Sequence, residues 1–223
     1  MERIIIFGDS IMRGVLLEDG KYICPSEERR VREESTGLEI ENCCKFGATI
    51  EKGQSIIRRR IAKGNMPARC LLEYGGNDSD FDWAEVAAAP YGEHCCKTMP
   101  ELFMQKYSEI IAELRAAGCE PVLSTLPPLC AERYLNWFCR DGVDKDSVLI
   151  WLGEADAIYR WQEYYSHLVE HVAEKNGCDV MHMRDAFLKQ PLKPGDRMCL
   201  DGIHPNRKGQ DVIYAVIREK FGA

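Results

Sequence analysis

The chain has 223 residues, of which 45% are hydrophobic and 29% charged, and its formal net charge is −7 at pH 7. This composition is typical of a globular protein and excludes a fibrous or intrinsically disordered chain. The acidic balance argues against a nucleic-acid partner, since nucleic-acid-binding proteins usually carry an excess of basic residues.

Apolar patterns along the chain predict strands and helices in alternation. Ile4–Phe7, which is rich in β-branched residues and is ended by Gly8, has the pattern of a buried strand. The polar stretch 18–37 has few periodic apolar residues and is interpreted as a surface excursion. Three elements follow it, an edge strand, a helix and a more central strand, at 38–43, 50–64 and 70–74.

Two long connections interrupt the second half of the chain, at about 79–99 and about 128–153. The remaining pattern predicts three helices and two strands, at 100–118, 154–175 and 207–221 and at 122–126 and 178–183. This alternation predicts one α/β domain over residues 1–223, with a doubly wound, five-stranded parallel sheet and helices on both faces. The two half-polar strands suit the sheet edges, which fits the flavodoxin-like strand order 2-1-3-4-5.

Four short motifs follow predicted strands or precede the last helix. Ser10 comes two residues after the first strand, Gly47 follows the edge strand, and Asn77 follows the central strand. Because the carboxyl ends of parallel strands meet at one edge of a sheet, these three residues are expected to gather there. Near the other end of the chain, Asp201 precedes His204 by three residues, a spacing that a tight turn can bring to one side.

Together these motifs resemble the SGNH (GDSL-type) hydrolase family, which carries them in this order, and the resemblance extends from residue 4 to residue 206. Each motif is weak by itself, but four in the right order are specific. The resemblance implies that Ser10 is the nucleophile and that Asp201 and His204 complete a catalytic triad. It also implies oxyanion-hole donors from the amides of Ser10 and Gly47 and the side chain of Asn77, and the same strand order. Ile11 stands where the family name implies Leu, and both are apolar.

The chemistry of these residue types agrees with those roles. A neutral serine hydroxyl is a poor nucleophile and needs an adjacent base, which His204 can supply. Asp201 can hold the imidazole in the required tautomer without itself becoming protonated. A glycine at position 47 lets a backbone donor approach the substrate closely. An asparagine in an oxyanion hole lowers the reaction barrier by about 3 kcal/mol.

Structural explanations exist for most of these residues. Ser10 alone could be a helix cap, and His204 could be a capping or core histidine, but the ordered motifs favour catalysis. Asp9 and Asp78 are interpreted as turn formers or as residues of the substrate pocket. His167 and His171 match an H-x-x-E-H zinc pattern without an evident third ligand, so neither a metal nor a cofactor is expected.

The eleven cysteines are scattered and include no C-x-x-C pair, which fits neither a disulfide framework nor a zinc ribbon. Free thiols suit a reducing cytoplasm. The N-terminal apolar run has four residues, too few for a secretory signal, and no run approaches the length of a membrane span. The sequence therefore predicts a cytoplasmic protein without a membrane partner, and it leaves the oligomeric state open.

We interpret the chain as a serine esterase that hydrolyses a small-molecule carboxylic ester through an acyl-enzyme. The acyl group is expected to be short, as in an acetyl ester, and the alcohol polar, as in a carbohydrate. The two long connections mix aromatic with hydrogen-bonding residues, which suits a sugar ring. Trp83, Tyr134 and Trp137 are therefore candidate pocket residues, although the same aromatic side chains could belong to the core.

Three other functions remain as alternatives. An acyltransferase or a thioesterase could use the same site, because an acyl-enzyme can be formed from a thioester or attacked by another alcohol. A non-catalytic carbohydrate-binding protein is disfavoured, since every predicted triad and oxyanion position carries a competent residue.

Overall fold

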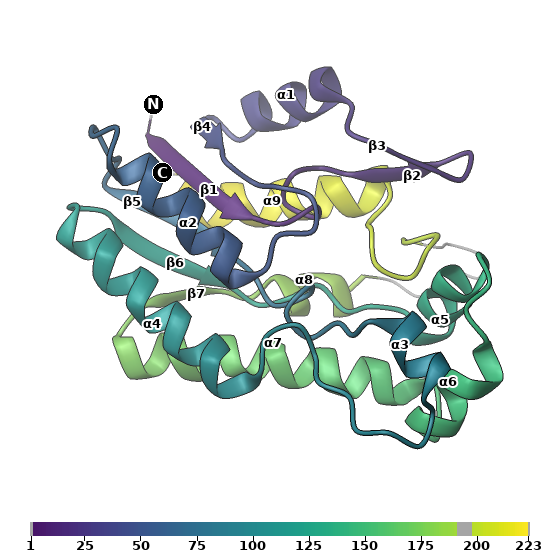
Figure 1. The fold of residues 1–223 in the computed structure, drawn as a ribbon. Helices are drawn as coiled ribbons and strands as arrows, with labels where there is room; N and C mark the ends of the chain where they lie inside the picture. The colour runs from purple at the N-terminus through teal and green to yellow at the C-terminus, as the bar shows by residue number, and fades with distance from the viewer. Residues whose placement is uncertain (1, 191–197, 223) are drawn as a thin grey trace.

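The computed structural model describes residues 2–190 and 198–222. The single domain was predicted over residues 1–223, so residues 1, 191–197 and 223 of that prediction lie outside the described residues. Five parallel strands form the central sheet: β1 (Arg3–Gly8), β4 (Glu39–Asn42), β5 (Arg69–Glu73), β6 (Glu120–Ser124) and β7 (Asp179–Met181). Their order across the sheet is β4-β1-β5-β6-β7 (Figure 1). Numbered among themselves, the strands follow the order 2-1-3-4-5, so the predicted α/β architecture is confirmed.

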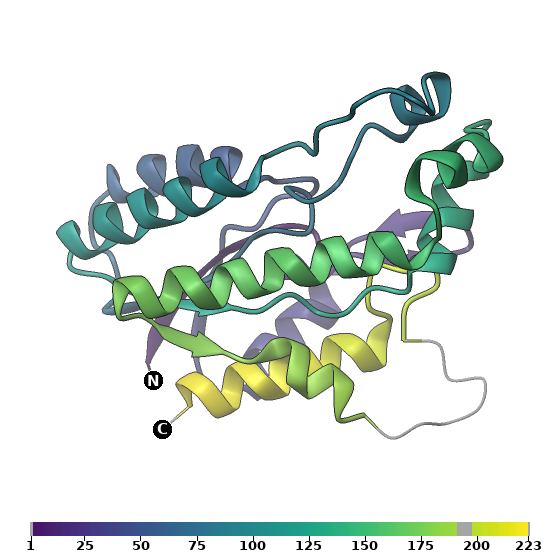
Figure 2. The same cartoon turned by 90° about the horizontal axis from the view of Figure 1, so that it is seen from below.

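Helices cover both faces of the sheet (Figures 1 and 2). One face carries α2 (Ile50–Ile61), α4 (Pro100–Ala116) and α7 (Asp156–Asn176). The other carries α8 (Met183–Leu188) and α9 (Arg207–Phe221), with α1 (Ser26–Ser35) beside α9 and β4. Ile5 and Phe7 of β1 pack toward the first group and Ile4 and Ile6 toward the second. Burial on both faces explains why this strand carries no polar side chain after Arg3.

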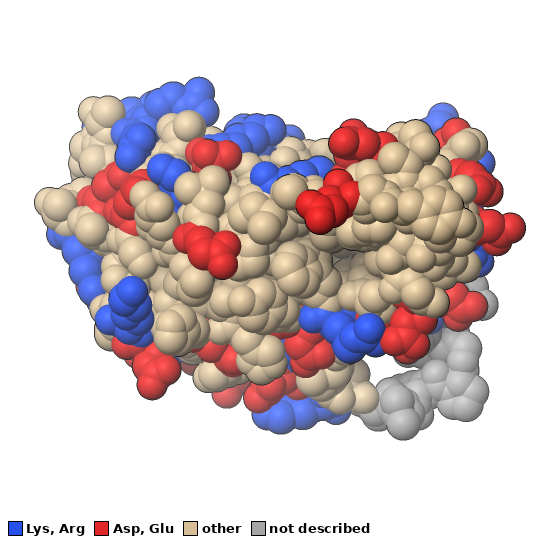
Figure 3. Space-filling model, turned by 60° about the horizontal axis from the view of Figure 1, so that its bottom comes forward, with Lys and Arg blue, Asp and Glu red and all other residues tan. Residues whose placement is uncertain are grey.

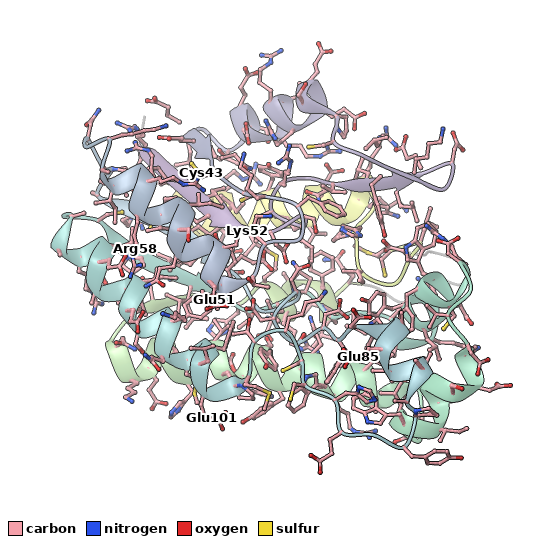
Figure 4. The ribbon with its side chains drawn as sticks, in the orientation of Figure 1. Cys43, Glu51, Lys52, Arg58, Glu85 and Glu101 are labelled. Carbon is pink, nitrogen blue, oxygen red and sulfur yellow. The ribbon has the colours of Figure 1, made fainter. Side chains whose placement is uncertain are left out.

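The helices on the first face pack closely against the sheet and against each other. Pro100 opens α4, a position where its missing N–H costs nothing, and Phe103, Tyr107 and Leu114 are buried along that helix. A side chain at Gly53 of α2 would come within 2.4 Å of the Tyr74 ring, so the helix can approach the sheet only because residue 53 is glycine. On the outer surface, Arg58 of α2, which is labelled in Figure 4, forms an ion pair with Glu113 of α4 at 2.7 Å.

The stretch 18–37, predicted as a surface excursion, contains regular structure. An antiparallel hairpin joins β2 (Leu16–Glu18) to β3 (Lys21–Ile23) through Asp19-Gly20, and α1 follows. Asp-Gly between two strands is a strong hairpin signal, because both residues tolerate positive φ, and here φ is 47° and 74°. Helix α1 has no buried residue, so its sequence carries no apolar periodicity that would predict it.

The two predicted connections also contain helices, α3 (Trp83–Ala88) in the first and α5 (Ala131–Cys139) and α6 (Lys145–Leu152) in the second. These three helices pack with the start of α7 around Trp83, Leu135 and Val148. They lie beyond the carboxyl ends of the strands, away from the two chain termini (Figure 1). The connections therefore form a small helical layer beside the edge of the sheet that carries the motifs.

The surface drawn in Figure 3 carries charges of both signs, and the cysteines are reduced. On that face, basic and acidic side chains are interspersed (Figure 3). All eleven cysteines are free thiols. No helix within the described residues has the length and apolarity needed to cross a membrane.

Candidate active site

Ser10, His204 and Asp201 meet at the carboxyl edge of the sheet. The turn after β1 holds Ser10, and the loop before α9 holds the other two residues. Ser10 Oγ lies 2.9 Å from His204 Nε2, and His204 Nδ1 lies 2.6 Å from Asp201 Oδ2. The residues are 5%, 6% and 0% exposed, so water screens these interactions weakly. This is the arrangement in which an imidazole can take a proton from a serine hydroxyl.

Four hydrogen-bond donors contact the two oxygens of the Asp201 carboxylate. Its Oδ1 accepts the backbone N–H groups of Ile203 and His204 at 2.9 and 2.8 Å. Its Oδ2 faces His204 Nδ1 and also accepts the Tyr22 hydroxyl at 3.0 Å. Burial opposes ionisation of Asp201, but the hydrogen bond and charge of His204, with the two amides, hold its pKa below the ordinary value. The carboxylate is therefore charged at neutral pH.

The loop that carries Asp201 and His204 is held in place at Asn206 and at Gly202. Asn206 caps α9, since its side chain accepts the Gly209 N–H at 3.0 Å. Gly202 has a φ of 89°, and a Cβ there would lie 2.4 Å from Tyr134 N and 2.5 Å from Cys130 O. Only glycine fits such a backbone angle and such a close approach to the start of α5.

The predicted oxyanion donors lie around the same cavity as Ser10. Gly47 has a φ of 64°, and no atom of the chain lies within 4 Å of a Cβ placed there. The backbone angle, and not crowding inside the protein, favours glycine at this position. Asn77 Nδ2 donates to Asp9 Oδ2 at 2.9 Å and to Ala48 O at 3.3 Å.

Asp9 lines the cavity, but its carboxylate is occupied within the protein. Oδ1 accepts the Ile11 N–H at 2.8 Å, and Oδ2 accepts from Asn77. Glu73 of β5 lies beneath it and is fully buried. Burial raises the pKa of both carboxyls, and the Asp9 charge raises the pKa of Glu73 further, so Glu73 is the protonated member of the pair. A glutamate within the apolar run 70–74 is a sequence signal that could have drawn attention to it.

Two residues expected to form the substrate pocket, Asp78 and Trp137, are not among the residues that line the cavity. Asp78 is fully buried and its carboxylate accepts the Ile50 N–H at 2.9 and 3.2 Å, in place of a cap from Thr49. Burial raises its pKa to about 7. Trp137 packs against Tyr22, with their ring centroids 5.9 Å apart.

The cavity has a volume of about 440 Å³. Ser10, Asn77 and His204 line it, together with Trp83 and Tyr134 from the two connections. Most of the remaining wall is apolar and comes from both connections and from α7: Phe81, Leu129, Trp151, Leu152, Ile158 and Trp161. Aromatic residues in the connections were evident from the sequence, but their common wall depends on how the helical layer packs.

The histidine pair of the zinc-like pattern lies elsewhere, on the exposed surface of α7. His167 Nδ1 is 3.2 Å from Glu170 Oε2, and the same glutamate faces His182 Nδ1 at 3.6 Å. Within residues 2–190 and 198–222, no group of three or more His, Cys, Asp or Glu side chains is arranged to hold a metal ion.

Solved structures share this fold at low sequence identity. A lipase/acylhydrolase from Enterococcus faecalis matches with a TM-score of 0.65 and 18% identity, over 99% of this chain and 95% of its own. A catalytic mutant of an acetylxylan esterase from Geobacillus stearothermophilus matches with a TM-score of 0.64 and 15% identity, over 99% and 94%. A GDSL-like lipase from Bacteroides thetaiotaomicron matches with a TM-score of 0.62 and 14% identity, over 98% and 87%.

No curated protein matches the chain. The model of the GDSL-like lipase/acylhydrolase family matches residues 6–212, a span that includes the Ser10, Gly47, Asn77 and Asp201–His204 motifs. The chain therefore belongs to the GDSL-like lipase/acylhydrolase family and is a serine ester hydrolase.

Proposed function

We propose that the protein hydrolyses a carboxylic ester through an acyl-enzyme on Ser10. The observation that carries this proposal is the continuous chain of contacts from Ser10 Oγ through His204 to Asp201, at 2.9 and 2.6 Å. Ser10 Oγ attacks the ester carbonyl carbon while His204 Nε2 takes the hydroxyl proton. The tetrahedral intermediate then expels the alcohol, which receives that proton. A water molecule, deprotonated by His204, attacks the acyl-enzyme and releases the acid and free Ser10.

The oxyanion of each tetrahedral intermediate is assigned to the amides of Ser10 and Gly47 and to Asn77 Nδ2. The hydrogen bond from Asn77 Nδ2 to Ala48 O is long, at 3.3 Å. The N–H group in this weaker bond is therefore the one that would donate to the substrate oxygen instead. The shorter bond to Asp9 Oδ2, at 2.9 Å, would keep the amide oriented during that exchange. Donors that are held in place before the reaction stabilise the transition state without reorganisation.

We keep an acetyl ester of a polar alcohol, such as a carbohydrate, as the first substrate proposal. The name of one structural neighbour, an acetylxylan esterase, agrees with it, although its 15% identity carries only the fold. The cavity lining also bears on the size of the acyl group. Phe81, Trp83 and Trp151, which come from the two connections, together form part of an apolar wall.

That wall favours a second candidate, an ester with a larger apolar acyl group. A cavity of about 440 Å³ is large enough to bury such a group. Contact between the group and the aromatic lining would remove apolar surface from water, which favours binding. Hydrolysis of p-nitrophenyl esters of increasing acyl length distinguishes the candidates. The acetyl proposal requires the highest kcat/KM with acetate, whereas a preference for octanoate supports the second candidate.

Replacement of the nucleophile tests the whole proposal. Ser10→Ala should abolish ester hydrolysis while the circular-dichroism spectrum and the unfolding temperature stay close to those of the wild type. A fluorophosphonate should label the wild-type protein at Ser10 and leave the variant unlabelled. Undiminished turnover by Ser10→Ala would exclude the acyl-enzyme mechanism. Transfer of acetyl groups to an added sugar or alcohol would point to the acyltransferase alternative, and faster cleavage of acyl thioesters to the thioesterase.

We also propose a cytoplasmic location, which the eleven free thiols support because such thiols persist in a reducing compartment.

A further inference from the structure

Tyr22 connects an element remote in sequence to the acidic end of the triad. It lies on β3, in the stretch that was predicted as a surface excursion, at the same end of the molecule as α5 (Figure 1). Its hydroxyl donates to Asp201 Oδ2 at 3.0 Å across 179 residues of sequence. Its ring also packs on the imidazole, with the Tyr22 and His204 ring centroids 4.8 Å apart.

The hydroxyl is not needed to hold the carboxylate in place. Asp201 Oδ1 already accepts two backbone amides, from Ile203 and His204, and these fix the plane of the group. Tyr22 binds the other oxygen, Oδ2, which is the one that faces His204 Nδ1 at 2.6 Å. The phenol is a donor here, because burial and then the Asp201 charge raise the pKa of Tyr22.

We propose that Tyr22 is a positioning residue that sets the pH range in which His204 can act as the base. A second donor on Oδ2 spreads the negative charge of Asp201 and weakens its attraction for a protonated imidazole. The imidazolium then gives up its proton at a lower pH, so the enzyme retains activity under more acidic conditions. This inference rests on the proposed serine esterase mechanism and concerns its pH dependence.

The other groups around His204 are the same in wild type and in Tyr22→Phe, so this variant tests the Tyr22 hydroxyl alone. Asp201 and Asp9 supply the nearby negative charges, and Ser10 Oγ contacts Nε2. Phe46 stacks on the outer face of the imidazole at 5.9 Å and carries no charge. Arg140, whose guanidinium lies 3.3 Å from the Trp137 ring centre, is the cation on the Tyr22 side. Tyr22→Phe keeps all of these groups and the ring contacts, and removes only the donor.

The test measures kcat/KM against pH for wild type and Tyr22→Phe with a p-nitrophenyl ester. The midpoint of the ascending limb should move to higher pH by about half a unit to one unit, and the alkaline plateau should change only a few-fold. Below the midpoint the variant should therefore be about three- to ten-fold slower. Tyr164→Phe is the matched control, because Tyr164 is 43% exposed against 39% for Tyr22 and lies outside the cavity lining.

An NMR titration of the His204 ring protons in both proteins gives the same shift without an activity assay, and so covers a variant that turns over too slowly. An unchanged midpoint, or one that moves to lower pH, overturns the inference. A uniform loss of kcat at every pH would assign Tyr22 a purely structural role and would also overturn it. Ser10→Ala distinguishes a failure of the esterase mechanism from a failure of the inference about Tyr22. An active Ser10→Ala variant would refute the mechanism itself, whatever the result with Tyr22→Phe.

Discussion

The backbone N–H of Cys130 donates to the carbonyl oxygen of Gly202 at 2.8 Å. This bond joins the start of α5 to the loop that carries Asp201 and His204, so the helical layer around the cavity and the proposed catalytic residues form one structure. The contact is possible because residue 202 has no side chain.

Gly202→Ala should therefore damage both stability and catalysis. The new Cβ would lie 2.4 Å from Tyr134 N, and φ at this residue is 89°. We expect a loss of about 3–5 kcal/mol in the free energy of unfolding, from backbone strain together with overpacking. We also expect at least about a 100-fold fall in kcat/KM, because a displacement of about 1 Å in the loop misaligns the base. Urea unfolding and steady-state kinetics measure the two effects.

Gly118→Ala is the control for the Gly202 variant. Gly118 has a φ of 75°, and no atom lies within 4 Å of its position for a Cβ. That substitution should cost only about 1–2 kcal/mol, the penalty of the backbone angle, and should leave kcat/KM near the wild-type value. Equal losses in the two variants would show that the contact with α5 is unimportant.

Asn77→Ala should lower kcat by about 100- to 1000-fold and change KM little, because an oxyanion donor acts mainly in the transition state. Asn176→Ala is the matched control, since its side chain makes bonds of similar length, 2.8 Å to Val172 O and 3.3 Å to Ser108 Oγ, away from the cavity. Steady-state kinetics of both variants decide the assignment. A change confined to KM in Asn77→Ala would make Asn77 a substrate-binding residue.

Glu73→Gln should stabilise the protein at pH 7. Burial and the Asp9 charge raise the pKa of folded Glu73 well above its ordinary value of 4.5. The unfolded chain releases this proton above about pH 4.5 while the folded chain keeps it, so stability falls by about 1.4 kcal/mol per pH unit until the folded pKa is reached. A glutamine stays neutral and removes that loss.

The measurement for Glu73 is the free energy of unfolding in urea at pH 5, 6 and 7. The stability of Glu73→Gln should decline less steeply with pH than that of the wild type. Glu85→Gln, on the exposed surface of α3 (Figure 4), should follow the wild-type slope. Parallel slopes for Glu73→Gln and wild type would mean that Glu73 is ionised in the folded protein.

The sequence by itself determined the strands and helices of the parallel sheet and the identity of the motifs, and its strand order agreed with the half-polar edge strands and with the family resemblance. The last helix was predicted at 207–221 and is found at Arg207–Phe221, and both half-polar strands lie at the edges as expected. These features are local: burial on one or two faces of an element leaves a period in its own sequence. The position of Ser10, Gly47 and Asn77 at one edge then follows from the parallel topology.

The tertiary structure alone decided which side chains meet. The sequence pattern contained no sign of the contact between Tyr22 and Asp201, and it did not distinguish Trp83 and Tyr134, which line the cavity, from Trp137, which does not. An aromatic residue has the same local signature whether it lines a cavity, fills a core or covers a histidine. Which of these it does depends on the packing of segments far apart in the chain, since the free energy of burial depends on area and carries no information about the partner.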